Sequence, residues 1–206
     1  ISLVIRGLYN PPSQTAELAY SEDISLQAIQ NVVLLLKLMY EKMHDGLMPT
    51  LEDLLKCFNN FDLVQEMCEE LEKDEELAKE YELQLSYFKQ YFYKGSEGRK
   101  DMQRYVHFAS STLDVLLRSA EARNIICNRY NNMDFGAVLD EGKIVLISTR
   151  PYEIGGTADQ GFGKFFLMLM MCSVENNREL VKNRIPHFLY IYELDHYGTA
   201  GLDDLF

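Results

Sequence analysis

The chain has 206 residues, of which 47% are hydrophobic, so it can bury a core and is not a disordered segment. Its 32 acidic residues against 20 basic ones give a net charge of −12, which argues against a uniformly basic nucleic-acid surface but leaves room for a local basic loop. The longest apolar runs, 32–39 and 165–174, fall short of the roughly 18–20 residues that span a bilayer. We therefore expect a cytoplasmic protein that reaches the inner face of a membrane only through regions outside this chain.

Residues 12–130 predict an all-α domain. Its first long helix covers 21–46, where Gly46 stops a pattern that places five residues on one face: Leu26, Ile29, Val33, Leu36 and Tyr40. A second helix is expected to begin after Thr50, a candidate N-cap. Asp53 lies three residues further on and completes a capping-box pattern.

Residues 62–95 predict one or two further helices. The acidic run Glu69–Glu82 has the composition of a binding tail. However, the apolar residues in and just before it keep helical phase, which favours the interpretation of the acidic residues as the solvated face of a helix. These apolar residues are Leu63, Met67, Leu71, Leu77 and Tyr81. Residues 99–127 predict another helix with an inward face of Met102, Tyr105, Val106, Ala109, Leu113 and Leu116.

From about residue 131 the periodicity changes. The apolar runs 144–148 and 187–194 predict strands, and the apolar stretch from Gly163 predicts a helix between them. Continuous apolar strands joined by a crossover helix indicate a parallel sheet buried on both faces, to which residues 1–11 could add a strand. The predicted fold class is therefore α/β with a large all-α insertion.

The cysteines and histidines predict no structural metal. No CxxC pair occurs, and the histidines lack metal-ligand spacing. We expect reduced cysteines that pack as small apolar residues: Cys57, Cys68, Cys127 and Cys172.

Residues 158–165 come close to a phosphate-binding loop between a predicted strand and a predicted helix. Ala158 replaces the first glycine of the motif, and Phe165 replaces the hydroxyl residue that would hold Mg²⁺. We therefore interpret this stretch as a loop whose glycines permit a turn, with Lys164 on the helix surface.

The apolar run that ends at Glu193 has the form of a Walker B strand. Such a strand ends in Asp-Glu, and here Tyr192 precedes Glu193. On spacing alone, a buried strand with a polar end is the better interpretation.

Several motifs taken together resemble the HerA–FtsK class of RecA-like motor ATPases, specifically the coupling-protein and conjugation ATPases of type IV secretion. The matching residues are Met133-Asp134-Phe135, Gly142-Lys143, Arg178 and Glu193. The resemblance covers about the last 80 residues, and no motif of the family is complete. It implies that residues 131–206 are part of a RecA-like P-loop NTPase core, into which 12–130 are inserted. Because Walker A is absent, it also implies a fragment whose P-loop lies upstream.

The resemblance implies a site for ATP and Mg²⁺ in the intact protein, although we expect no measurable ATP binding by this chain alone. Glu193 would activate the attacking water. Tyr192 stands at the position of the Mg²⁺-shell Asp, which a neutral phenol cannot replace. Three alternatives account for a tyrosine at this position: the protein is an inactive or slow paralogue, the residue is misread, or Asp195 takes the place of the missing carboxylate. Arg150 is either an arginine that completes a neighbouring subunit's site or a surface turn residue.

Two functions follow. In the first, the chain is part of an ATP-driven motor that moves DNA or protein through a conjugation or secretion channel. It would act as a ring of identical subunits, and its helical domain would recruit secretion-channel or relaxosome proteins, with DNA as a further partner. The alternative is a non-catalytic helical protein-interaction module.

Overall fold

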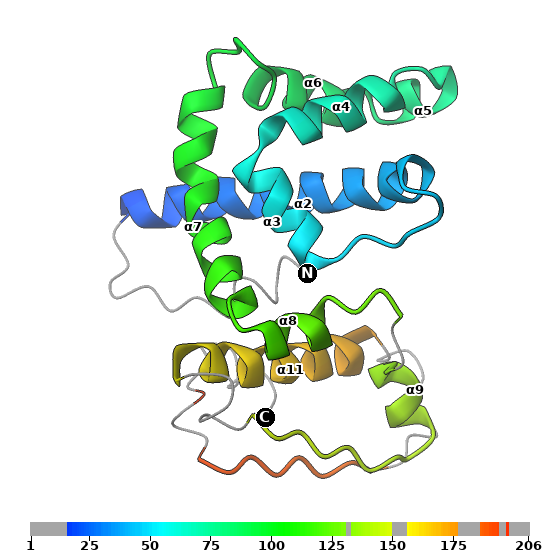
Figure 1. Ribbon diagram of the computed structural model, residues 1–206, viewed down its shortest axis with the longest axis vertical. Coiled ribbons are helices and arrows are strands. Elements are labelled where there is room, and N and C mark those ends of the chain that lie inside the picture. The colour runs from blue at the N-terminus through cyan, green and yellow to red at the C-terminus, as the bar shows by residue number, and fades with distance from the viewer. Residues whose placement is uncertain (1–15, 131–132, 150–155, 177–185, 194–196, 198–206) are drawn as a thin grey trace. The chain divides into compact units, whose positions relative to one another are not determined.

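The computed structural model describes residues 16–130, 133–149, 156–176, 186–193 and 197 (Figure 1). The strand expected in residues 1–11 lies outside this part of the chain. The described residues divide into two compact units. The N-terminal unit takes in those up to Asp114, and the C-terminal unit takes in those from Val115 onward.

The N-terminal unit is built on α2 (Ala16–Met43), which packs against α3 (Leu51–Asn59) and α4 (Phe61–Leu71). Its buried stripe repeats every three to four residues, as an amphipathic helix requires, and comprises Ala28, Ile29, Val32, Leu35, Leu36, Met39 and Tyr40. The predicted residues Leu26 and Val33 are only half-buried, whereas Val32 and Leu35 are buried.

The end of α2 and the start of α3 agree with the sequence. Gly46 has φ +81°, and its N–H donates to the carbonyl of Glu41 at 2.9 Å, which closes the helix end. The capping box is also confirmed. The Asp53 carboxylate accepts from the Thr50 N–H and the Thr50 hydroxyl, each at 2.9 Å. It also accepts from the Tyr40 hydroxyl at 2.8 Å, which ties α3 to α2.

Residues 62–95, expected to form one or two helices, belong to three. After α4 the chain enters α5 (Glu75–Glu80) and α6 (Glu82–Tyr91), and α6 packs against α4. Asp74 caps α5 by accepting from the Leu77 N–H at 3.2 Å. The residues Leu71–Asp74 therefore mark a bend that the continuous helical phase of the sequence concealed.

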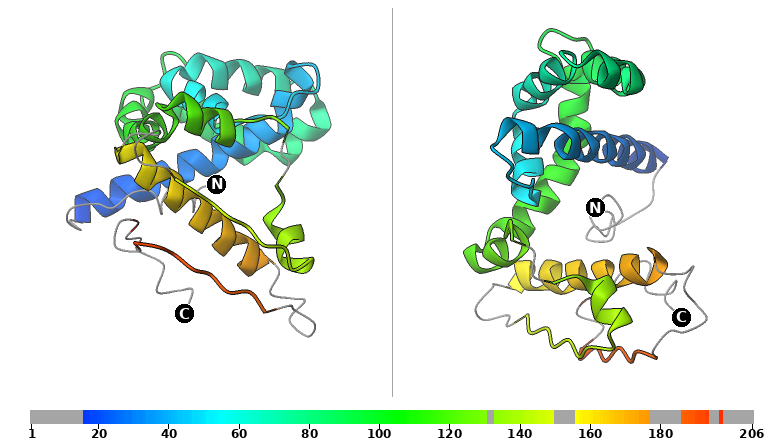
Figure 2. Two further views of the ribbon diagram at one scale, coloured as in Figure 1. Left: turned by 60° about the horizontal axis from the view of Figure 1, so that its bottom comes forward. Right: turned by 90° about the vertical axis from the view of Figure 1, so that its right-hand side faces the viewer.

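The single helix predicted over 99–127 is two helices, α7 (Arg99–Leu117) and α8 (Ala120–Ile126). The hydroxyl of Ser119 accepts from the Ala122 N–H at 3.3 Å and caps α8. The predicted inward face of α7 is buried except for Tyr105, which is half-buried. The backbone carbonyl of Tyr105 accepts from the Ser25 hydroxyl where α7 passes α2 (Figures 1 and 2).

In the C-terminal unit, α9 (Phe135–Asp140) packs against α11 (Gly156–Asn176). Aromatic rings join them, with the centroids of Phe135 and Phe166 6.1 Å apart, and within α11 the Phe166 ring also lies 4.9 Å from that of Phe162.

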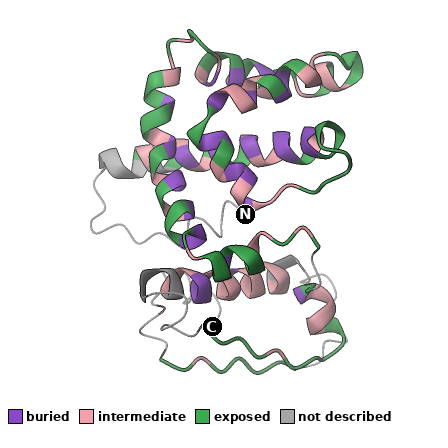
Figure 3. Cartoon of the chain, viewed as in Figure 1, coloured by how far each residue is buried: buried purple, intermediate pink, exposed green. Residues whose placement is uncertain are grey.

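The predicted parallel sheet is wrong, because none of the described residues of 144–149 and 186–193 forms a strand. Ile144 and Leu146 are 90% and 91% exposed, and Phe188 and Tyr190 are exposed as well (Figure 3). A strand of a parallel sheet is covered on both faces, which these side chains are not. A short apolar run carries no information on which partner strands exist, so the partial RecA-like core is not formed by the described residues.

The cysteines differ in burial. Cys57 and Cys68 are buried, Cys127 and Cys172 are partly exposed, and the structure joins no two of them in a disulfide. Burial, followed by the nearby charge of Asp53, raises the pKa of the Cys57 thiol to about 12, and burial likewise raises the pKa of Cys68. A raised pKa leaves less of the reactive thiolate.

We therefore expect Ellman's reagent, near pH 8, to label Cys127 and Cys172 at least about tenfold faster than Cys57 and Cys68. Mass spectrometry of the labelled chain would give the rate at each site, and urea should equalise the four rates. Equal rates in the folded protein would contradict the burial of the two cysteines.

Candidate functional site

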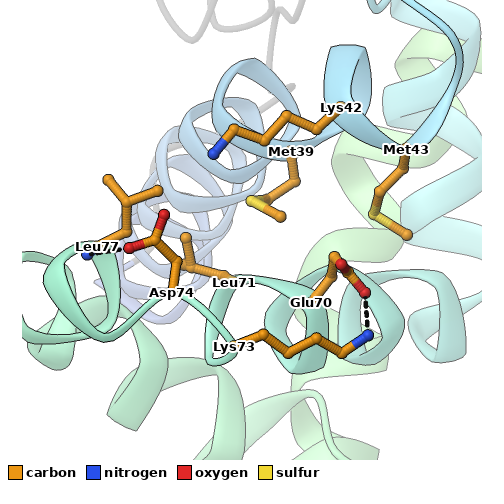
Figure 4. A pocket seen from close by; sticks show the side chains of 8 residues that line it. All are labelled: Met39, Lys42, Met43, Glu70, Leu71, Lys73, Asp74 and Leu77. Carbon is orange, nitrogen blue, oxygen red and sulfur yellow. Dashed lines mark hydrogen bonds and ion pairs between the residues drawn. The ribbon is translucent and has the colours of Figure 1, made fainter.

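The site is a pocket in the N-terminal unit, between the C-terminal end of α2 and the junction of α4 with α5 (Figure 4). Its volume is about 540 Å³, within the range of about 300–1,000 Å³ typical of ligand pockets. Eight residues line it: Met39, Lys42, Met43, Glu70, Leu71, Lys73, Asp74 and Leu77.

The apolar part of the lining comes from both sides. Met39 and Met43 lie one turn apart on α2, and their thioether ends point toward the side of the pocket formed by α4 and its junction with α5 (Figure 4). Met39 and Leu71 are buried, whereas Met43 is 37% exposed. Methionine side chains are flexible and polarizable, and they adapt to the shape of a bound group.

The charged groups of the pocket are partly engaged with one another. The Lys73 ammonium pairs with the Glu70 carboxylate at 2.5 Å, and the Asp74 carboxylate caps α5. Both interactions lie on the wall opposite α2 (Figure 4). The pocket is thus an apolar hollow with a charged border.

The sequence reasoning missed this pocket. Two signals were available: the i, i+4 pair Met39 and Met43 at the end of α2, and the N-cap pattern of Asp74 followed by acidic Glu75 and Glu76. The second signal marks the break between α4 and α5 that forms one wall. No local pattern indicates that these two regions meet.

The predicted Walker-B-like residues lie elsewhere, in the C-terminal unit. Tyr192 and Glu193 form a turn in which both side chains are exposed, and Glu193 has φ +55°. Arg150 and Asp195, predicted as the trans arginine and the substitute acid, lie outside the described residues. The structure therefore brings no second acidic or basic group of that predicted site to Glu193 within the part it describes.

The other residues that carry the family resemblance have local roles where they are described. Asp134 caps α9 by accepting from the N–H groups of Gly136 at 2.8 Å and Ala137 at 3.3 Å. Gly142 has φ +65°, and Lys143 pairs with Glu141 at 2.5 Å. Arg178 lies outside the described residues.

Residues 158–165 are not a loop, because α11 already begins at Gly156. Lys164 is not on the surface but buried, and burial lowers its pKa. The Tyr197 ring lies so close to Gly163 that an added Cβ would come within 2.3 Å of it. The Tyr197 hydroxyl is 2.9 Å from the Thr149 hydroxyl. Because glycine has no Cβ, position 163 leaves room for the ring of Tyr197.

No group of three or more His, Cys, Asp or Glu side chains suited to a metal ion occurs among the described residues. Within the same part of the chain, no helix has both the length and the apolar character needed to cross a bilayer.

Comparison of the chain with protein-family models, curated proteins and solved structures gives no match. The resemblance to the motor ATPases therefore stays a prediction from sequence, and function has to be argued from the site itself.

Proposed function

We propose that the N-terminal unit is a protein-interaction module whose pocket between α2 and the α4–α5 junction receives an apolar side chain of a partner protein. The observation that carries this proposal is the hollow of about 540 Å³ with methionine and leucine side chains in its lining. Buried apolar anchors that fill such pockets contribute a large share of the binding energy at protein interfaces.

Three of the four charged groups that line the pocket are engaged within the protein, which favours binding over catalysis. Glu70 and Lys73 neutralise each other, and Asp74 is held by its cap to α5. A general acid or base must instead be aimed at a reacting atom of the substrate. We put this module forward in place of the motor, because the motor needs a sheet that the described residues do not form.

Selection from a phage-displayed peptide library against the whole chain tests the proposal. Met43 lines the pocket, whereas Leu83 on α6 is 82% exposed and lies outside it. Met43→Gln removes apolar contact area from the pocket. We expect it to weaken binding of the selected peptides by about tenfold, the equivalent of about 1.4 kcal/mol. Leu83→Gln should change binding by less than about twofold.

Both variants keep a good helix former, so circular dichroism should show the same thermal midpoint as the parent chain. Selected peptides that bind the parent chain and the Met43→Gln variant equally well would refute the pocket as the binding site. Failure to enrich any peptide would count equally against the module.

A further inference from the structure

We infer that the partner segment is a basic amphipathic helix, whose apolar face enters the pocket between α2 and the α4–α5 junction while its lysine or arginine side chains face the acidic border. This inference rests on the proposed function and names the chemistry of the partner.

The first observation is the charge around the pocket. Residues 66–82, which hold the end of α4 and all of α5, include nine acidic and two basic residues. One of those lysines, Lys73, is neutralised by Glu70. The α4–α5 segment as a whole therefore carries an excess of negative charge, although one of its carboxylates, Glu72, pairs with Lys89 of α6 at 2.5 Å.

Part of this charge is uncompensated. Glu66 lies one turn before Glu70 on α4, and Glu75 and Glu76 directly follow the pocket residue Asp74. Glu66, Glu75 and Glu76 are exposed and take part in no ion pair among the described residues. Exposed Glu41 and Asp45 add negative charge on the α2 side, beside Lys42. This negative charge would attract a basic partner, raise its rate of association and orient it as it binds.

The second observation concerns the backbone of the partner. The pocket is formed by side chains of helices, and the described part of the N-terminal unit contains no strand to which an extended peptide could add. An extended peptide would bring unpaired N–H and C=O groups to an apolar surface, which is costly. A helix satisfies its own backbone groups and presents apolar anchors at i, i+3, i+4 and i+7.

Three fluorescein-labelled peptides of about 18 residues test this inference by fluorescence anisotropy with the whole chain. The first carries leucines at i, i+3, i+4 and i+7 with lysines on the other face. The second replaces each lysine with glutamate. The third keeps the lysines and leucines but has two central prolines, which break the helix. The first peptide should bind at least about tenfold more tightly than either of the others.

Two double variants with the same charge change show where the basic helix binds. Glu75→Gln with Glu76→Gln removes two charges beside the pocket. Glu97→Gln with Asp101→Asn removes two exposed charges elsewhere in the N-terminal unit, where neither residue lines the pocket. We expect the first pair to weaken binding about three- to tenfold, as two partly screened charge interactions would, and the second pair less than about twofold.

The outcomes separate this inference from the proposed function. Selected peptides that lack basic residues but depend on Met43 would overturn the basic helix and leave the interaction module standing. Equal loss of binding in the two double variants would show attraction to the overall negative charge and would overturn the inference. Binding of the proline peptide as tight as that of the first peptide would also overturn it. Failure of both the library and the basic helix to show binding that depends on Met43 would refute the module itself.

Discussion

Replacing Asp53 with alanine is expected to lower the free energy of unfolding by about 3 kcal/mol. The Asp53 side chain is buried, and it accepts from the Thr50 N–H, the Thr50 hydroxyl and the Tyr40 hydroxyl at 2.8–2.9 Å. Alanine removes the Asp53 half of the capping box, worth about 1 kcal/mol, and takes the Asp53 acceptor away from a buried tyrosine hydroxyl, which costs about 1–3 kcal/mol.

Glu52→Ala is the matched control. Glu52 and Asp53 both lie 3.4 Å from the Lys56 ammonium, but Glu52 is partly exposed and its ion pair lies at the surface. Its loss should cost less than about 1 kcal/mol. Urea unfolding followed by far-ultraviolet circular dichroism measures both variants. Equal destabilisation would show that the buried network contributes nothing beyond the charge of the carboxylate.

Phe92→Ala is expected to lower the free energy of unfolding by about 3–5 kcal/mol, at least as much as Asp53→Ala. The Phe92 ring is fully buried, with ring centroids 4.4 Å from Phe61 and 5.3 Å from Phe88. The cavity left by alanine would sit between α4 and the end of α6, the elements that Arg99 also joins. Arg99 pairs with Asp62 at 2.7 Å and donates to the Phe92 carbonyl at 2.8 Å.

Leu83→Ala provides the comparison for Phe92→Ala on the same helical segment. The Leu83 side chain is mostly exposed, so its truncation should change the free energy of unfolding by no more than about 0.5 kcal/mol. The same urea titration applies to both. A cost below about 1 kcal/mol for Phe92→Ala would contradict the close packing of the Phe92 ring against Phe61 and Phe88.

The features that could be predicted from the sequence depend on residues close together in the chain. The capping box needs only Thr50 and Asp53, three positions apart, and the stop of α2 needs only Gly46. Helical phase likewise identified most of the buried face of α7. In each case the physical cause lies within one turn of helix, so the local sequence contains it.

The features that could not be predicted depend on contacts between distant residues. The run 144–148 has the composition of a buried strand, but its burial depends on neighbours that composition does not specify. The pocket exists because Met43 of α2 and Leu77 of α5, more than thirty residues apart in the chain, line the same hollow. Lys164 shows the same limit, because its burial follows from how α11 packs and not from its own neighbours in the sequence.

Nuclear magnetic resonance of the chain labelled with ¹³C at the methionine methyl groups tests the central claim most directly. The chain has nine methionines, of which Met39 and Met43 line the pocket, whereas Met102 is buried in α7 away from its lining. Titration with the basic helical peptide should shift the Met39 and Met43 resonances and leave that of Met102 in place. Shifts confined to the methionines of the C-terminal unit, with Met39 and Met43 unmoved, would contradict the claim that this pocket receives a partner.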